Sequence, residues 1–276
     1  MDLGYDGTAF AGWAVQPGLR TVAGVLVGSL ARLLRTGGAD LGLVVAGRTD
    51  AGVHAAGQVA HVDVPATAWT VLPGRSDLTP AAALLRRLAG ILPPDVRVHG
   101  VAPAPPGFDA RFSALRRRYV YRVCDDPAGV PPLRRYDVLA HRRPLDVAAM
   151  DDAAGRLVGL HDFAAFCRRR AGATTVRTLL EYAWTRDGDG FAVARVVADA
   201  FCHSMVRALV GAVLPVGEGR RDVGWPAGVL AAGRRDPAAA VVPALGLTLA
   251  EVVYPDDADL ATRATQARAV RTLPAS

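Results

Sequence analysis

The first 102 residues alternate between strand-like and helix-like patterns, and this order restricts the folds that the chain can adopt. Strands are predicted within residues 2–7, 41–46, 58–64 and 96–102. Apolar residues at helical spacing predict two helices, from Thr21 to the glycines at 37–38 and over residues 80–92. Thr21 and Thr79 are suitable N-caps for them. The resulting order, strand–helix–strand–strand–helix–strand, is a split βαβ pattern.

The second half offers a similar order. Strands are predicted at the end of residues 108–123 and at 176–185, 191–200 and 247–254; helices are predicted at 146–158, 203–216 and 226–232. Two such units favour an α+β fold: two RRM/ferredoxin-like halves share a broad antiparallel sheet, with helices on one face and an RNA-binding cleft on the other. The expected divisions are residues 1–107, residues 108–255 and a mobile tail at 256–276, for which a surface helix over residues 259–271 is the alternative.

One loop concentrates the residues suited to chemistry. The sequence GRTDAGVHA, residues 47–55, follows the apolar run at 41–46, and its glycines give backbone freedom around Arg48 and Asp50. Asp50 has two interpretations, either a turn-capping residue or an ionised carboxylate kept charged by a nearby arginine. An oriented carboxylate can act as a nucleophile, as a base or as a stabiliser of a sugar cation.

Other side chains have similarly divided interpretations. Asp6 suits a second acid or a turn residue, and His54 suits a proton carrier or a hydrogen bond within its own loop. His61 and His203 suit structural or RNA-contacting roles. Tyr119, beside three arginines on a predicted strand, is either a core residue or a ring that stacks on a base taken out of an RNA helix. Two-residue alternation places Tyr121 on the same face, where we expect a structural role.

The charge balance leaves the partner class open. The net charge is +6, and because the chain contains no lysine, every fixed positive side chain is an arginine. Arginine runs at 116–118 and 168–170 fit either a solvated surface or a track for a polyanion such as RNA.

Composition restricts the environment and the cofactors. Hydrophobic residues make up 51% of the chain, but no apolar run is long enough for a membrane span, and the N-terminal residues do not resemble a signal segment. We therefore expect a cytoplasmic protein. The three cysteines, at 124, 167 and 202, show no paired spacing, so we expect small core residues and neither a zinc site nor a disulfide framework. No metal or cofactor signature is present.

Four stretches together resemble a known family. GRTDAGVHAAGQVAHV, YDGTAFAGW, ARFSALRRRYVYRV and FCHSMVRALVGAV are similar to the tRNA pseudouridine synthase A family, and the resemblance covers residues 3–254. It implies isomerisation of uridine to pseudouridine in the anticodon stem-loop of tRNA, at positions 38, 39 and 40. It also implies a homodimer that holds one tRNA, with no metal or organic cofactor.

The same resemblance assigns roles residue by residue. Asp50 would be the catalytic nucleophile, and Arg48 would help to displace and hold the target nucleotide. Tyr119 would stack on the target uracil, and Arg207 would pair with Asp50. Departures from the family pattern after Trp13, at 88–92 and at 168–177 concern substrate positioning more than chemistry. The alternatives are a non-catalytic RNA-binding protein of the same fold and a nucleoside N-glycosidase.

Overall fold

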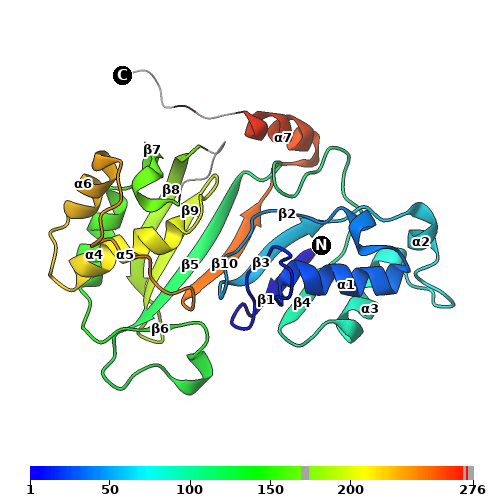
Figure 1. Ribbon diagram of the computed structural model, residues 1–276, viewed down its shortest axis with the longest axis horizontal. Coiled ribbons are helices and arrows are strands. Elements are labelled where there is room, and N and C mark those ends of the chain that lie inside the picture. Colours follow the sequence, from blue (N-terminus) through cyan, green and yellow to red (C-terminus); the bar gives the residue numbers. More distant parts are fainter. Residues whose placement is uncertain (169–173, 270–271, 273–276) are drawn as a thin grey trace. The chain divides into compact units, whose positions relative to one another are not determined.

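The computed structural model describes residues 1–168, 174–269 and 272. It is an α+β fold that divides into two compact units (Figure 1). Unit 1 comprises Met1–Leu115 and Leu249–Arg268, and unit 2 comprises Arg116–Thr248. The second and third residues of the 168–170 arginine run, and the last residues of the expected tail, lie outside the described residues.

Unit 1 contains a mostly antiparallel sheet in the order β4-β1-β3-β10, with β2 paired to β3. Its strands are β1 (Asp2–Tyr5), β2 (Val44–Val45), β3 (His54–His61), β4 (Val96–Gly100) and β10 (Leu247–Val253). Its α-helices are α1 (Val22–Leu34), α2 (Ala66–Thr70), α3 (Pro80–Ile91) and α7 (Leu260–Arg268). The 3-10 helices η1 (Gly38–Leu41) and η4 (Asp257–Asp259) complete this unit.

Local signals explain the principal helices of unit 1. The Thr21 side chain accepts a hydrogen bond from the Gly24 N–H and begins α1, and the Thr79 side chain does the same for α3 through the Ala82 N–H. Both predicted caps are confirmed. Leu26 and Leu30 in α1, and Leu84 and Leu88 in α3, are almost completely buried, so each helix turns one apolar face to the core.

Unit 2 contains strands in the order β5-β9-β8-β7, with the short β6 added in parallel to β5. Its strands are β5 (Arg116–Cys124), β6 (Leu139–Ala140), β7 (Gly159–Asp162), β8 (Val176–Arg186) and β9 (Ala192–Ala198). Its α-helices are α4 (Val147–Gly155), α5 (Met205–Gly217) and α6 (Trp225–Ala232). The 3-10 helices are η2 (Pro132–Arg134) and η3 (Phe163–Phe166).

The hairpin and the alternation predicted for unit 2 are confirmed. Strands β8 and β9 pair antiparallel across a turn at residues 187–190, in which the Gly190 N–H donates to the Asp187 carbonyl. In β5, Tyr119, Tyr121 and Val123 are buried, whereas Arg118, Val120 and Arg122 on the other face are partly exposed.

Three stretches differ from the sequence-based expectation. Residues 41–46 form only the two-residue strand β2, because η1 ends at Leu41 and Gly42 adopts a left-handed φ of 50° that interrupts extended structure. Strand β3 begins at His54, inside the motif, rather than at residue 58. Residues 161–168, which lie between the predicted helix at 146–158 and the predicted strand at 176–185, include the end of β7 and all of η3.

The unit boundaries also differ from the expected divisions. Residues 108–115 belong to unit 1 because they are bonded to it: the Tyr254 hydroxyl donates to the Ala110 carbonyl, and the Ser113 hydroxyl donates to the Leu260 carbonyl. Within the expected tail, the alternative of a helix over residues 259–271 is observed as α7, whose Leu260 and Ala264 are buried. Arg268 pairs with Asp109 at 3.0 Å, so this helix is anchored to unit 1.

Candidate functional site

The GRTDAGVHA loop connects β2 to β3 in unit 1. Arg48 is exposed, Thr49 is 6% exposed and Asp50 is half-buried. The Val53 N–H donates to the Asp50 carbonyl at 3.2 Å, and Gly52 adopts a φ of 78°, which closes a tight turn after the carboxylate. The structure thus confirms a carboxylate in a tight turn, between two strands that are neighbours in one sheet.

The segment at residues 7–13 lies against this loop and is bonded to it through the backbone. The Trp13 N–H donates to the Thr49 carbonyl at 3.0 Å, and the Gly52 N–H donates to the Phe10 carbonyl at 3.3 Å. Gly12 has a φ of 99°, and a Cβ atom there would lie 3.0 Å from the Thr49 carbonyl oxygen. The close approach of the two loops therefore requires glycine at residue 12.

A group of buried polar side chains lies behind the loop. The Tyr5 hydroxyl is 2.8 Å from Thr49 Oγ1, and Gln58 Nε2 donates both to the Tyr5 hydroxyl and to the Gly47 carbonyl. Burial raises the pKa of Tyr5 to about 12, so its hydroxyl stays protonated at neutral pH. Sequence reasoning missed Tyr5, Thr49 and Gln58 as functional residues, although all three lie in the stretches that carry the family resemblance.

Asp6 and His54 both make hydrogen bonds that fit the structural alternative. Asp6 Oδ1 accepts from both the N–H and the hydroxyl of Thr8, as a turn residue does. His54 is buried, and its Nδ1 accepts from the Gly7 N–H at 3.1 Å. That nitrogen is also 3.1 Å from Asp6 Oδ1, but the Gly7 N–H can only donate, so the Nδ1 lone pair is directed to Gly7. His54 therefore fixes the turn at Gly7.

Tyr119 and Arg207 belong to unit 2. Tyr119 is 8% exposed, and its ring meets that of Phe201 edge to face, with 5.0 Å between the ring centroids. Arg207, in the first turn of α5, donates from Nε to the Val242 carbonyl at 2.7 Å. Phe201 was not among the predicted site residues, although it opens the FCHSMVR stretch.

The remaining candidates are held by structural contacts. His61 Nδ1 accepts from the Ala110 N–H, and the Tyr121 hydroxyl donates to the Pro243 carbonyl. The His203 carbonyl accepts from the Arg168 N–H. Within the 116–118 run, Arg117 is 8% exposed and donates to the Asp199 carbonyl, so that run is not a uniformly solvated face.

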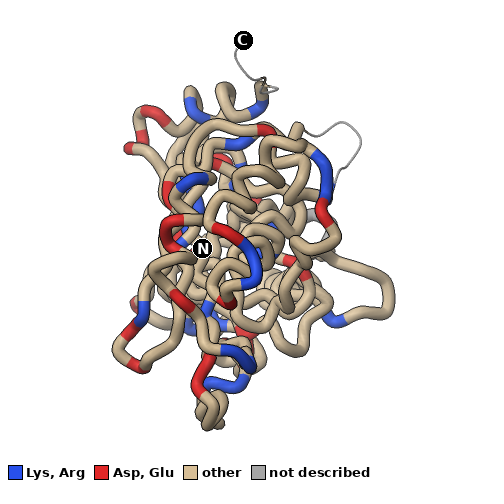
Figure 2. Tube along the Cα trace, turned by 90° about the vertical axis from the view of Figure 1, so that its left-hand side faces the viewer, with Lys and Arg blue, Asp and Glu red and all other residues tan. Residues whose placement is uncertain are grey.

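Several arginines are paired with aspartates, which lowers the positive charge around them. Arg186 donates to both carboxylate oxygens of Asp125, and Arg134 contacts Asp137 and Asp189. Figure 2 shows the arginines interleaved with acidic residues along the trace. Acidic partners therefore neutralise several arginines locally, and the net charge of +6 does not by itself define a binding face.

One expectation for the cysteines is wrong. Cys167 and Cys202 form a disulfide, with 5.7 Å between their Cα atoms, whereas Cys124 is a free, buried residue as expected. The pairing brings together the end of η3 and the turn before α5. It is invisible in the sequence pattern because the two cysteines are 35 residues apart.

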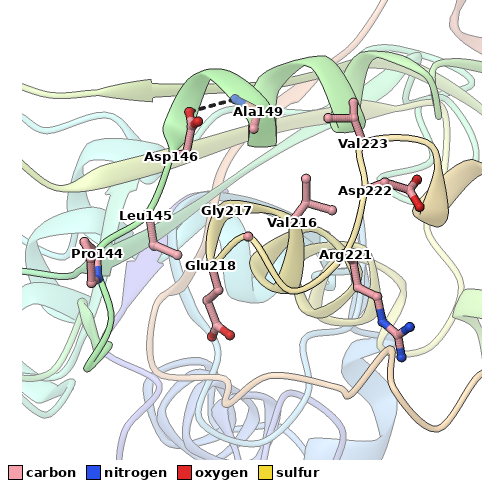
Figure 3. Close-up of a pocket in the computed structure, with 11 residues that line it drawn as sticks. Pro144, Leu145, Asp146, Ala149, Val216, Gly217, Glu218, Arg221, Asp222 and Val223 are labelled. Carbon is pink, nitrogen blue, oxygen red and sulfur yellow. Dashed lines mark hydrogen bonds between the residues drawn. The ribbon is translucent and has the colours of Figure 1, made fainter.

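A cavity of about 590 Å³ in unit 2 contains none of the predicted site residues. It lies beside the N-terminus of α4 and the C-terminus of α5 (Figure 3). Glu218 lines it, but this carboxylate is 3.0 Å from His141 Nε2 and also contacts Arg143 and Arg220. These contacts explain Glu218 as a residue that holds the end of α5.

Within residues 1–168, 174–269 and 272, no group of three or more His, Cys, Asp or Glu side chains is arranged to hold a metal ion. Over the same residues, no helix combines the length and the apolar character needed to cross a bilayer.

Comparisons with known proteins show which family the chain belongs to. A family model described as tRNA pseudouridine synthase matches residues 153–255. A tRNA pseudouridine synthase A from Frankia casuarinae is 61% identical over 274 residues, which is 99% of this chain and 95% of that protein. The protein of the same name from Streptomyces griseus is 58% identical over 275 residues, 99% of this chain and 94% of that protein. At this identity and coverage, the chain belongs to the tRNA pseudouridine synthase family.

Proposed function

We propose that this protein isomerises uridine to pseudouridine in the anticodon stem-loop of tRNA, at positions 38, 39 and 40, and that Asp50 is its catalytic nucleophile. As a member of the tRNA pseudouridine synthase family, the protein is an isomerase that acts on tRNA. The observation that carries the role of Asp50 is its place in a tight loop that is bonded to its surroundings on several sides.

The reaction needs an oriented carboxylate. The C1′–N1 glycosidic bond breaks, the uracil rotates, and C1′ joins C5, while the proton lost from C5 is balanced by one gained at N1. A carboxylate can serve by attacking C1′, by adding to the ring at C6, or by removing a sugar proton to drive elimination. Each route requires the carboxylate to be held within reach of the sugar or base, as expected for an anchored loop.

The partner residues are assigned to substrate handling. Arg48 is exposed beside Asp50, which suits contact with the displaced nucleotide. The Tyr119 ring is fixed by Phe201, which suits stacking on a flipped uracil. Arg207 is oriented by its bond to Val242 and would pair with Asp50.

The assembly is also part of the proposal. We expect the two units to be RRM-like halves that share one broad sheet and an RNA-binding cleft, and two copies of the chain to hold one tRNA in the cytoplasm. Sedimentation of the purified protein, alone and with tRNA, tests the dimer. A single monomeric species in both cases would contradict it.

Asp50→Asn tests the catalytic assignment. The variant should bind unmodified tRNA with about the wild-type affinity, because the amide keeps the shape of the side chain, but it should form no pseudouridine. Site-resolved detection of pseudouridine measures the product, and fluorescence anisotropy measures binding. Asp77→Asn is the matched control, since Asp77 is exposed in the loop before α3.

Each alternative gives a different result. Pseudouridine formed by Asp50→Asn would disprove the role of Asp50. Binding without any product from the wild-type protein would favour a non-catalytic RNA-binding protein. Release of free uracil would identify an N-glycosidase, and modification outside positions 38–40 would contradict the proposed substrate sites.

A further inference from the structure

The buried side chains behind the catalytic loop form a connected hydrogen-bond network. Tyr5, Thr49 and Gln58 are 5%, 6% and 0% exposed, so none can exchange these bonds for water without local opening. The Tyr5 hydroxyl lies 2.8 Å from Thr49 Oγ1, and Gln58 Nε2 donates to the Tyr5 hydroxyl at 3.2 Å. A buried polar group that loses its partner carries an uncompensated desolvation cost, so the network resists displacement of any member.

The two amide hydrogens of Gln58 connect the network to the loop at two points. A glutamine amide nitrogen has two hydrogens, and Gln58 Nε2 places one on the Tyr5 hydroxyl and the other on the Gly47 carbonyl, 2.9 Å away. The Tyr5 hydroxyl shares its other hydrogen bond with Thr49 Oγ1, and either oxygen can donate in it. Gln58 therefore contacts the start of the loop directly at Gly47 and its centre indirectly at Thr49.

The burial pattern connects this network to Asp50. Arg48 is exposed, Thr49 is buried and Asp50 is half-buried, so the middle residue of the three points inward while its neighbours are nearer to solvent. Fixing the Thr49 side chain limits the rotation of the two adjoining peptide units, and the Thr49 carbonyl is further held by the Trp13 N–H. The direction of Asp50 is then set by its neighbour.

We propose that Tyr5, Gln58 and Thr49 are positioning residues that hold the Asp50 carboxylate in its reactive orientation without contacting the substrate. The inference rests on the catalytic role proposed for Asp50. It predicts that weakening the network lowers the rate of the chemical step and leaves tRNA affinity nearly unchanged. Misplacing a reacting group by about 1 Å can cost on the order of 100-fold in rate.

Tyr5→Phe is the sharpest test. It removes one oxygen atom, keeps the ring that lies 6.0 Å from Trp13, and leaves the bond from Gln58 to Gly47 in place. We expect the single-turnover rate on unmodified tRNA to fall roughly 10- to 100-fold, with the Kd for tRNA within about twofold of wild type. Tyr254→Phe, which deletes a hydroxyl bonded to Ala110 in the same unit, is the matched control and should keep the wild-type rate.

Substitutions at Thr49 provide a second, independent test. Thr49→Ser keeps the hydroxyl and should retain most of the rate, whereas Thr49→Val keeps the shape, loses the hydroxyl and should behave like Tyr5→Phe. All rates are normalised to the folded fraction from circular dichroism, so a variant that folds poorly is still compared correctly. If Thr49 had only a structural role, its substitution would lower the folded fraction. The rate per folded molecule would then be the same in Thr49→Ser and Thr49→Val.

The outcomes distinguish this inference from the proposed function. Wild-type rates for both Tyr5→Phe and Thr49→Val would overturn the positioning role and leave the role of Asp50 intact. Equal losses in Tyr5→Phe and Tyr254→Phe would also overturn it, because the effect would then be general. Product formation by Asp50→Asn would instead disprove the role of Asp50.

Discussion

Gly12→Ala should damage both stability and activity, and Gly18→Ala isolates the reason. Both glycines lie in the loop between β1 and α1 and have positive φ values, 99° and 72°. A Cβ at Gly18 would meet nothing within 4 Å, whereas one at Gly12 would lie 3.0 Å from the Thr49 carbonyl oxygen and 3.2 Å from the Ala51 nitrogen. The two substitutions thus share backbone strain, and only Gly12→Ala would bring a new methyl group against the loop that carries Asp50.

The magnitudes follow from these two effects. An L-residue with a positive φ costs about 1–2 kcal/mol, partly offset by the lower entropy of the unfolded chain. Crowding in a tightly packed region adds about 1–3 kcal/mol. Gly18→Ala should therefore lower the free energy of unfolding by roughly 1 kcal/mol and Gly12→Ala by roughly 2–4 kcal/mol.

Urea unfolding followed by circular dichroism measures the stability difference, and single-turnover kinetics measure the consequence for the site. The Thr49–Ala51 backbone must move by a few tenths of an ångström to admit the new methyl group of Gly12→Ala. We expect a loss of rate in Gly12→Ala but not in Gly18→Ala. If the two variants match in both stability and rate, the proposed contact between the loops does not control the site.

Two further predictions concern stability. The guanidinium of Arg186 lowers the pKa of the Asp125 carboxyl, and that of Arg20 lowers the pKa of Asp95. Because each carboxyl has a lower pKa in the folded state than in the unfolded state, each ion pair stabilises the fold. This contribution is complete above the unfolded pKa of about 3.9 and is lost as pH falls through the lower folded pKa values. Asp125 is 8% exposed and Asp95 is 25% exposed, so the ion pair of Asp125 should contribute more to the pH dependence of stability. Between pH 5 and pH 3, the free energy of unfolding measured in urea should therefore fall less in Asp125→Asn than in Asp95→Asn. Equal slopes of this free energy against pH in the two variants would contradict the prediction. Reduction of the Cys167–Cys202 disulfide should lower the free energy of unfolding by roughly 2–4 kcal/mol. Alkylation of the urea-unfolded protein without reductant should label only Cys124, which is buried in the folded protein. Labelling of all three cysteines would contradict the pairing.

Local signals were sufficient for the elements with strong periodicity and caps. The helices after Thr21, Thr79 and Asp146 begin where a side-chain oxygen accepts the expected N–H, which is information contained within a few residues. The alternation in β5 is similarly local. The strand predicted over residues 41–46 was wrong in length, because an apolar run does not reveal that Gly42 adopts a left-handed conformation.

Long-range contacts could not be predicted in the same way. Tyr5 and Thr49 are 44 residues apart, Tyr5 and Gln58 are 53 apart, and Cys167 and Cys202 are 35 apart. No periodic pattern links such pairs, because their contact depends on which strands become neighbours. The loop that carries Asp50 was therefore identifiable from its composition and glycines, whereas the residues that hold it were identifiable only in the folded chain.

Loops that carry reactive residues are often mobile, but the contacts around Asp50 favour a rigid one. The backbone of residues 7–13 holds it through Phe10 and Trp13, and Gln58 and Tyr5 hold it through Gly47 and Thr49. A carboxylate that must act on a base already taken out of its stack gains little from mobility of its own, since the substrate supplies the movement. Rigidity in the protein and movement in the RNA are then complementary. This explains why buried polar bonds, normally a risk to stability, surround the proposed catalytic loop.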